Sequence, residues 1–245
     1  MEYSNIDGGG LCEGVDYEVE EAVHEDGDEV YDFAIRFADG SPLYFKMGEG
    51  EGEVMVCAKR RGFDYYRNYL EMPSGRIVIP SEVVYRGAKY RVTEIGGHAF
   101  HNCTKVVEVR IPDTVERIGE FAFFFCVSLR EVRIPDSVSE IGGFAFESCQ
   151  SLQGVVLPKG LKRISKSMFC GSELCEITIP EGVEEIEAHA FHGCEHLGCV
   201  RIPKSVERIG DKAFVGCVGL REVQLENGDV ELGEEAFPEG VRVEC

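Results

Sequence analysis

Tryptophan is absent from this 245-residue chain, and basic residues are scarce: 25 lysines and arginines stand against 45 aspartates and glutamates, for a net charge of -20. Because an acidic surface repels phosphate groups, nucleic acids and anionic membranes are unfavourable partners. No apolar run approaches the roughly 20 residues of a transmembrane helix, so the sequence predicts no membrane insertion. The first residues, MEYSNIDGGGLCEG, contain neither the basic nor the apolar segment of a signal peptide, so either the chain stays inside the cell or a leader has been removed.

Motifs that would indicate catalysis are also missing. The sequence contains no phosphate-binding loop of the G-x-x-x-x-G-K-[ST] type and no G-x-S-x-G elbow. A nucleophilic cysteine needs a partly exposed, electropositive setting, whereas the recurring cysteines of this chain fall at positions that we expect to be buried. We therefore predict no catalytic residue and no cofactor.

The sequence does contain an internal repeat, V-x-I-P-x-x-V-x-x-I-G-x-x-A-F-x-x-C-x-x-L, from residue 107 onward. One copy runs from Val109 to Leu129, and the next follows 23 residues later at every position. A third copy is one residue shorter, two more follow, and less regular copies stand before and after them. Five of the 11 cysteines fall at one repeat position, which predicts a column of buried, reduced thiols: Cys103, Cys126, Cys149, Cys194 and Cys217.

The repeat predicts one strand and one turn of helix in each copy. The alternation V-x-I places two apolar side chains on one side of a strand, which the proline then ends. In I-G-x-x-A-F-x-x-C-x-x-L the apolar residues stand three and four apart, a spacing that suits a short helix or 3₁₀ turns. Such units bury their apolar sides only by stacking. We predict an α/β leucine-rich-repeat solenoid, with a curved parallel sheet on one side and short helical or 3₁₀ segments on the opposite side.

This pattern closely resembles the BspA-type leucine-rich repeat family, with its consensus I-P-x-x-V-x-x-I-G-x-x-A-F-x-x-C. The segment from Val84 to Val92 looks like the hairpin at which the repeats of that family begin. The resemblance extends from about residue 77 to the end. It implies a protein of the cell surface or a secreted protein that binds host or matrix proteins. Ser165 and Glu187 depart from the consensus at the glycine position, and Ser172 lies near an expected cysteine.

We expect three parts along the chain. Residues 1–29 form an acidic arm, because the first 32 residues include twelve acidic residues and no lysine or arginine, a composition typical of a solvated, partly disordered segment. Residues 30–76 alternate apolar and polar side chains around turns, which predicts a β-rich N-terminal cap that shields the end of the stack from water. Residues 77–245 form the leucine-rich-repeat solenoid.

The outward positions of the predicted strands are the first candidate binding site. Because parallel strands lie about 4.8 Å apart, these positions stack into a column of glutamates beside a column of arginines. A less charged patch at Gly154, Val156 and Thr178 interrupts both columns. Protein interfaces generally have a less charged centre within a charged rim. Neutral drift of these residues explains the patch almost as well. The expected binding residues are Glu131, Arg133, Gly154, Val156, Glu176, Thr178 and Arg201.

An aromatic patch on the turn side of the coils is the alternative site. Phe121 and Phe144 fill the same outward position of adjacent coils, with His98 in the coil before. Exposed aromatic residues this close together are typical of interfaces. Coverage by the N-terminal arm or cap explains them equally well. The patch consists of Phe121, Phe124, Phe125 and Phe144.

A histidine cluster is the weakest candidate. His189, His192 and His196 stand three and four apart and could share a helix face that binds a metal ion. They occupy variable, outward repeat positions, however, and surface variation accounts for them without a ligand. We predict no metal site.

Taken together, the sequence predicts a non-catalytic protein-binding module of the cell surface or a secreted one, which acts in adhesion or ligand binding through its sheet face. The alternative is an intracellular scaffold or assembly protein that uses the aromatic patch. A metal-binding protein or an enzyme has the least support. The identity of the protein partner and the oligomeric state do not follow from these patterns, because repeat proteins change partners by exchanging surface residues on a fixed core.

Overall fold

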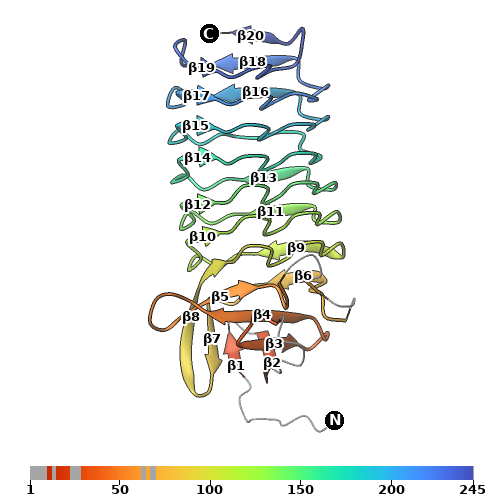
Figure 1. Cartoon of the computed structure of the whole chain (residues 1–245), viewed down its shortest axis with the longest axis vertical. Coiled ribbons are helices and arrows are strands. Elements are labelled where there is room, and N and C mark those ends of the chain that lie inside the picture. The colour runs from red at the N-terminus through yellow and green to blue at the C-terminus, as the bar shows by residue number, and fades with distance from the viewer. Residues whose placement is uncertain (1–9, 13–14, 23–28, 62–64, 67–69, 245) are drawn as a thin grey trace.

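The computed structural model describes residues 10–12, 15–22, 29–61, 65–66 and 70–244. The chain forms a stack of coils, with antiparallel strands at the N-terminal end and the C-terminus at the opposite end (Figure 1). Neighbouring coils are held together by parallel strand pairs on two sides of the stack. The predicted solenoid with parallel strands is therefore confirmed.

One side of the stack carries the strands of the V-x-I segments. They pair in register, so that Glu131 lies between Glu108 and Gly154 on the adjacent coils. The strands on this side fall into two groups, β6-β9-β11-β13 and β16-β18-β20. Their bounds are β6 (Gly75–Val78), β9 (Val106–Arg110), β11 (Glu131–Arg133), β13 (Gly154–Val156), β16 (Cys199–Ile202), β18 (Glu222–Leu225) and β20 (Arg242–Glu244).

A second series of short strands lies just before the repeat glycine. Each contains the isoleucine of the repeat, or Leu232 in the last strand, as in the pairing of Ile118 with Ile95 and Ile141. This series also divides in two, because Ser165 replaces a glycine of the repeat. The hydroxyl of Ser165 donates to the carbonyl of Ile141. One coil earlier, the backbone N–H of Gly142 donates to the equivalent carbonyl, that of Ile118. The strands are β8 (Ala88–Ile95), β10 (Arg117–Ile118), β12 (Glu140–Ile141), β14 (Arg163–Ile164), β15 (Glu185–Ile186), β17 (Arg208–Ile209) and β19 (Glu231–Leu232).

The predicted helical or 3₁₀ segments are wrong: the described residues contain no helix and form consecutive turns there. Alternate N–H groups bond within the coil, as from Ala99 to Gly96, and across to the next coil, as from Phe100 to Ala122. A helix needs all of these donors within its own segment. The backbone also enters the left-handed region twice per coil, as at φ 61° in His98 and 58° in Asn102, which interrupts a right-handed helix at both residues. The apolar spacing of three and four thus reflects turns that face the core.

The core consists of columns of identical side chains that run along the stack. Phenylalanine rings lie one above the other in successive coils, 5.0 Å apart between Phe100 and Phe123, and these rings are fully buried. Beside them four of the repeat cysteines, Cys126, Cys149, Cys194 and Cys217, donate the thiol proton to a phenylalanine carbonyl of another coil, as from Cys126 to Phe100 at 3.1 Å. Ser172 makes the same bond to Phe146 at 2.8 Å. The predicted buried column of the five repeat cysteines is confirmed.

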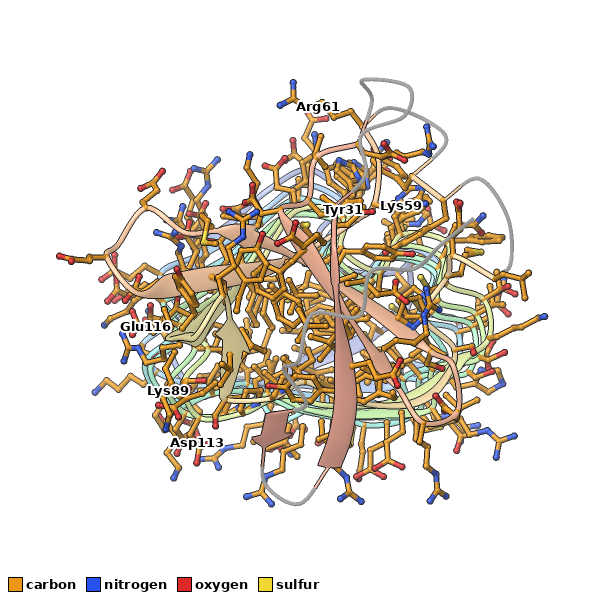
Figure 2. The ribbon with its side chains drawn as sticks, turned by 90° about the horizontal axis from the view of Figure 1, so that it is seen from below. Tyr31, Lys59, Arg61, Lys89, Asp113 and Glu116 are labelled. Atoms are coloured by element: carbon orange, nitrogen blue, oxygen red, sulfur yellow. The ribbon has the colours of Figure 1, made fainter. Side chains whose placement is uncertain are left out.

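The N-terminal strands extend one edge of the stack. They run antiparallel to one another until β5, which pairs in parallel with β8. The hairpin expected near Val84 is present as β7 and β8. Viewed from the N-terminal end, these strands cross in front of the coils (Figure 2). The strands are β1 (Gly10–Cys12), β2 (Val15–Glu21), β3 (Phe33–Phe37), β4 (Pro42–Met47), β5 (Glu53–Cys57) and β7 (Glu82–Tyr85).

The acidic segment 1–29 contributes to this antiparallel region. Strand β2 lies within the range predicted to be an arm, and it pairs with β3 over five residues. Glu20 accepts a hydrogen bond from Arg36 at 2.8 Å across this pair. Much of the remaining arm falls outside the described residues. Among the described residues no helix is long and apolar enough to cross a membrane.

Candidate protein-binding surface

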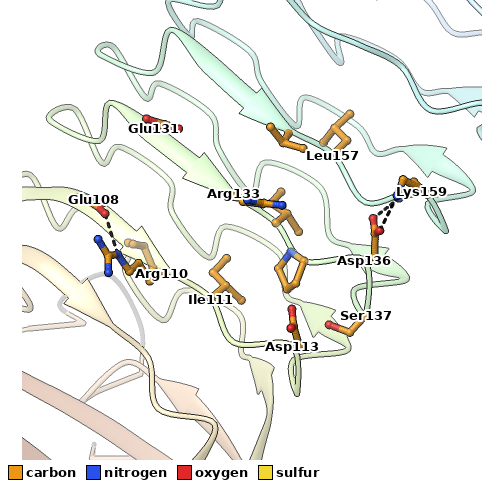
Figure 3. Close-up of a pocket in the computed structure, with 14 residues that line it drawn as sticks. Glu108, Arg110, Ile111, Asp113, Glu131, Arg133, Asp136, Ser137, Leu157 and Lys159 are labelled. Carbon is orange, nitrogen blue, oxygen red and sulfur yellow. Dashed lines mark hydrogen bonds and ion pairs between the residues drawn. The ribbon is translucent and has the colours of Figure 1, made fainter. Parts of the chain in front are cut away.

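A groove of about 770 Å³ runs over the outer face of β9, β11 and β13 (Figure 3). The alternation of each strand turns one side chain in two toward the groove, and the turns that follow the repeat prolines form its wall. Arg110 and Arg133 project from adjacent strands, and Asp113 and Asp136 from adjacent turns. The repeat itself therefore builds the groove, since the coils of β9 and β11 each supply one arginine and one aspartate.

Ion pairs hold two parts of the groove. Glu108 contacts Arg110 at 3.1 Å within β9. In the turns, Asp136 binds Lys159 of the next coil twice, through the backbone N–H and the ammonium group, each at 3.1 Å. The backbone and side-chain hydrogen bonds from Lys159 lower the pKa of Asp136. These contacts fix the charges at the two sides of the groove.

Between these pairs lie charged groups that have no partner. Glu131 and Arg133 are exposed on β11 and form no ion pair with any residue of the described chain. A charged side chain that is not held in an ion pair is available to a ligand, and an arginine can bind a carboxylate through two parallel hydrogen bonds. This pair can therefore contact a partner with both an acidic and a basic group.

The groove also has an apolar part. The side chain of Val156 is 59% exposed on β13, while Ile111 is half-buried and Ile134 and Leu157 are buried beneath the surface. A large aliphatic residue at an outward strand position leaves apolar surface in water, which burial against a partner would remove at about 25 cal/mol per Å². Apolar surface flanked by charges is the usual composition of an interface.

The predicted sheet-face residues separate in the structure. Glu131, Arg133 and Val156 line the groove. The other four do not line it. Gly154 lies on β13, and Glu176, Thr178 and Arg201 lie farther along the stack. Glu176 and Thr178 are exposed but belong to no strand, so the expected continuous column is wrong there, because the preceding copy is one residue shorter. Arg201 lies on β16 and binds Glu226.

The sequence reasoning missed the turn residues of the groove. Asp113, Asp136 and Lys159 follow the repeat prolines directly. Their signal was present, since the residue after each proline is charged in every complete copy. We did not expect a turn to form a wall beside the strands because the side chains of a turn have no fixed direction in a sequence pattern.

The predicted aromatic patch is present as two stacks of rings. Phe121 lies 4.6 Å from Phe144 with the planes 2° apart, and on its other side 5.0 Å from His98. Phe124 stacks on His101 at 4.8 Å. Phe125 is 39% exposed, whereas the other three phenylalanines are partly buried. The patch therefore exposes mainly ring edges.

The N-terminal segment contacts the first coil at this patch. Tyr65 stacks on His98 at 4.5 Å and lies 4.6 Å from His101. Burial lowers the pKa of His101 to about 4, and it lowers the pKa of His98 against the opposing effect of Glu120. Both imidazoles are accordingly neutral near pH 7. The N-terminal segment thus partly covers this end of the patch, which is one of the two explanations that the sequence left open.

The weak histidine candidate does not form a metal site in the described chain, where no group of three or more histidine, cysteine or acidic residues is arranged to hold an ion. His189 and His192 lie 5.5 Å apart between ring centroids, while His196 binds Glu173 at 2.7 Å. His192 also lies 3.9 Å from the thiol of Cys170. Burial raises the pKa of Cys170 to about 11, which leaves the thiol protonated at neutral pH and a poor nucleophile.

A column of alternating charge, which the sequence reasoning missed, runs along the second series of strands. Each member directly precedes the isoleucine of the repeat, or Leu232 in the last strand, and the strand pairing places Arg117 between Glu94 and Glu140. The Arg117–Glu94 distance is 2.6 Å. The pattern was visible in the sequence, but we had predicted no strand at these residues. The members are Glu94, Arg117, Glu140, Arg163, Glu185, Arg208 and Glu231.

Comparison with known proteins identifies the repeat. Residues 88–198 and 185–240 match the BspA type leucine rich repeat region, in six copies. The chain belongs to the BspA-type leucine-rich repeat family. A search of curated proteins found no match.

Solved structures of bacterial leucine-rich repeat proteins share this fold. A leucine-rich repeat protein from Bacteroides ovatus is 35% identical with a TM-score of 0.67, over 81% of this chain and 52% of that one. This chain thus spans about half the length of the Bacteroides protein. The leucine-rich repeat protein of T. pallidum is 28% identical with a TM-score of 0.65, over 78% and 83% of the two chains. The pneumococcal vaccine antigen PcpA, 16% identical with a TM-score of 0.52 over 86% and 70%, is similar in fold alone.

Proposed function

We propose that this BspA-type repeat protein is a non-catalytic module that binds another protein through the groove on β9, β11 and β13. The observation that carries the proposal is the arrangement of the groove: unpaired Glu131 and Arg133 beside the exposed Val156, between fixed ion pairs. Repeat solenoids generally bind proteins on such extended faces. The family match supports a protein-binding or surface repeat protein.

The place of action that we propose is the cell surface or the extracellular medium, with a role in adhesion. Its support is the family resemblance. The aromatic patch supports the alternative of a scaffold within the cell, since a partner could pack on Phe125 and the ring edges beside it. We also propose that the antiparallel N-terminal strands act as a cap, because β5 pairs with the first coil and shields its edge.

Affinity capture with two matched variants tests the groove. Val156→Glu adds a charge in the groove, and Val218→Glu adds the same charge at a valine that is 78% exposed outside it. We expect a partner captured from surface or cytosolic extracts by the native chain and by Val218→Glu to be lost with Val156→Glu. An unchanged circular dichroism spectrum establishes that both variants are folded. Capture by both variants alike would reject the groove as the site, and loss only with Phe125→Glu would move the site to the aromatic patch.

A further inference from the structure

The ladder of V-x-I strands is interrupted in the middle of the stack. Strands β13 and β16 lie on either side of residues 176–178, which form no strand. Within the described chain, the backbone of these three residues forms no hydrogen bond with the backbone of another coil. The core is also wider here, with 5.6 Å between the ring centroids of Phe169 and Phe191 against 5.0 Å between those of Phe191 and Phe214. This part of the sheet face therefore lacks the bonds that join coils elsewhere on the same side.

Two cysteines beside the interruption are open to solvent. Of the nine cysteines whose side chains the structure describes, Cys175 and Cys199 alone are exposed. Each directly follows or precedes a buried residue of the core, Leu174 and Val200 respectively. Both thiols therefore lie on the outer side of the stack, where a small molecule in solution can reach them.

The repeat places these cysteines on adjacent coils. Residues 175 and 198 stand one repeat of 23 residues apart, and Cys199 directly follows Gly198. The same two coils are in contact close by, because His196 binds Glu173 at 2.7 Å. Cys175 and Cys199 are thus neighbours across two coils, offset by one residue along the chain.

This placement meets the distance requirement of a disulfide. Adjacent coils lie about 4.8 Å apart and a strand rises about 3.3 Å per residue, so we expect about 6 Å between the Cα atoms of Cys175 and Cys199. Disulfides join residues whose Cα atoms are about 4.4–6.8 Å apart. Since residues 176–178 are in no ladder, the backbone can adjust to the bond without losing hydrogen bonds between strands.

We infer that Cys175 and Cys199 form a disulfide that joins two coils where the strand ladder is interrupted. The oxidant is a low-molecular-weight disulfide. The thiolate of one cysteine attacks it to form a mixed disulfide and releases one thiolate; the thiolate of the other cysteine then attacks the protein sulfur of the mixed disulfide and releases the second thiolate. Both cysteines are oxidised, and the oxidant is reduced to two thiols that take up the two protons. The bond persists in an oxidising medium, and the inference does not depend on the groove.

Peptide mapping after oxidation tests the pairing. The native chain is incubated with oxidised glutathione, the remaining thiols are blocked with N-ethylmaleimide, and the unfolded chain is cleaved after glutamate. This cleavage places Cys170, Cys175, Cys194 and Cys199 on four different peptides. We expect the peptide of residues 174–176 to be joined to that of residues 196–207, and dithiothreitol to separate them. Electrophoresis without reductant should show a monomer, because the bond lies within one chain.

Three variants serve as controls, with circular dichroism to establish that each is folded. Cys170→Ser removes a half-buried cysteine near the pair and should leave the joined peptides at the native yield. Cys175→Ser and Cys199→Ser should each abolish them and leave the other exposed cysteine bound to glutathione. In the native chain, glutathione on both cysteines without a bond between them would overturn the inference. A bond from Cys170 to Cys175, from Cys194 to Cys199 or between two chains would also overturn it.

Urea unfolding measures what the bond does to the stack. A disulfide restricts the unfolded chain, so we expect the oxidised native chain to unfold at a higher urea concentration than the reduced one. The same treatment should leave the midpoint of Cys175→Ser unchanged. Equal midpoints of the oxidised and reduced native chain would contradict a stabilising role of the disulfide at the interruption.

Discussion

At the scale of single residues, the buried column beside the phenylalanines depends on a hydrogen-bond donor more than on sulfur. Ser172 occupies the cysteine position of its coil and donates to the carbonyl of Phe146 at 2.8 Å, as the thiols do in other coils. We predict that Ser172→Val lowers the free energy of unfolding by about 1–3 kcal/mol, because that carbonyl loses its donor in the core. Ser172→Cys should lower the free energy of unfolding by less than Ser172→Val. Urea unfolding measures both, and equal costs would contradict this role of the donor.

Phe125 holds a backbone conformation that does not suit it. Its φ is 58°, in the left-handed region, and the equivalent residues of the adjacent coils are Asn102 and Ser148, with glycines farther along. A bulky residue in this region costs about 1–2 kcal/mol. We predict that Phe125→Asn raises the free energy of unfolding by up to about 1 kcal/mol, since the strain relieved exceeds the loss of a partly exposed ring. Phe123→Ala, in the core, should instead lower it by about 3–5 kcal/mol. Destabilisation by Phe125→Asn in urea unfolding would show that the ring contributes more than its strain.

At the scale of elements, the stack of Tyr65 on His98 and His101 ties the N-terminal segment to the first coil and responds to pH. Burial lowers the pKa of both histidines, that of His101 to about 4. Between an unfolded pKa near 6.5 and the folded value, the unfolded chain binds more protons. The histidines therefore contribute full stability above about pH 6.5 and lose it as the pH falls toward 4.

This pH dependence predicts the behaviour of one double variant. His98→Phe/His101→Phe places in the first coil the residues that stand at the equivalent positions of the next one, Phe121 and Phe124. We expect the native chain to lose more stability than the double variant between pH 7 and pH 5, as measured by urea unfolding at both values. Equal losses would mean that other groups, such as the carboxylates, determine the acid sensitivity.

The column of alternating charge makes a second prediction for the elements. Arg117→Glu places three glutamates on adjacent strands about 4.8 Å apart. We expect a loss of about 1 kcal/mol relative to the neutral control Arg117→Gln, because like charges directly opposite one another are destabilising. This difference should shrink in 1 M salt, which screens exposed charges. Urea unfolding at low and high salt measures it, and a difference that does not depend on salt would exclude a charge effect.

The sequence predicted the parts of the fold that repeat. The V-x-I strands and the cysteine column follow from alternation and periodicity, so the stacking and the residues Glu131, Arg133 and Val156 could be placed in advance. The helical segments could not be told from turns, because apolar residues three and four apart suit both, and only the bonds between coils distinguish them. The series of V-x-I strands is interrupted at Glu176–Thr178 because the preceding copy is one residue shorter. The periodicity of the repeat does not predict how the loss of one residue changes the local backbone.

At the scale of the whole molecule, each coil contacts only its neighbours, so surface residues can change without altering the core. This explains how one stack carries a charged groove and an aromatic patch at separate places. The net charge of -20 favours partners that present basic groups. Function in this protein is therefore a property of individual faces, and the face with the best-defined groove is that of β9, β11 and β13.

The most direct test of binding at that groove is photocrosslinking from a single site. Benzoylphenylalanine is introduced at position 156, inside the groove, or at position 218, a more exposed valine outside it. Each protein is irradiated in the extract from which a partner is captured. We predict a crosslinked protein from position 156 that is absent from position 218. Crosslinks of equal yield from both positions, or from position 218 alone, would contradict the assignment of the groove as the binding site.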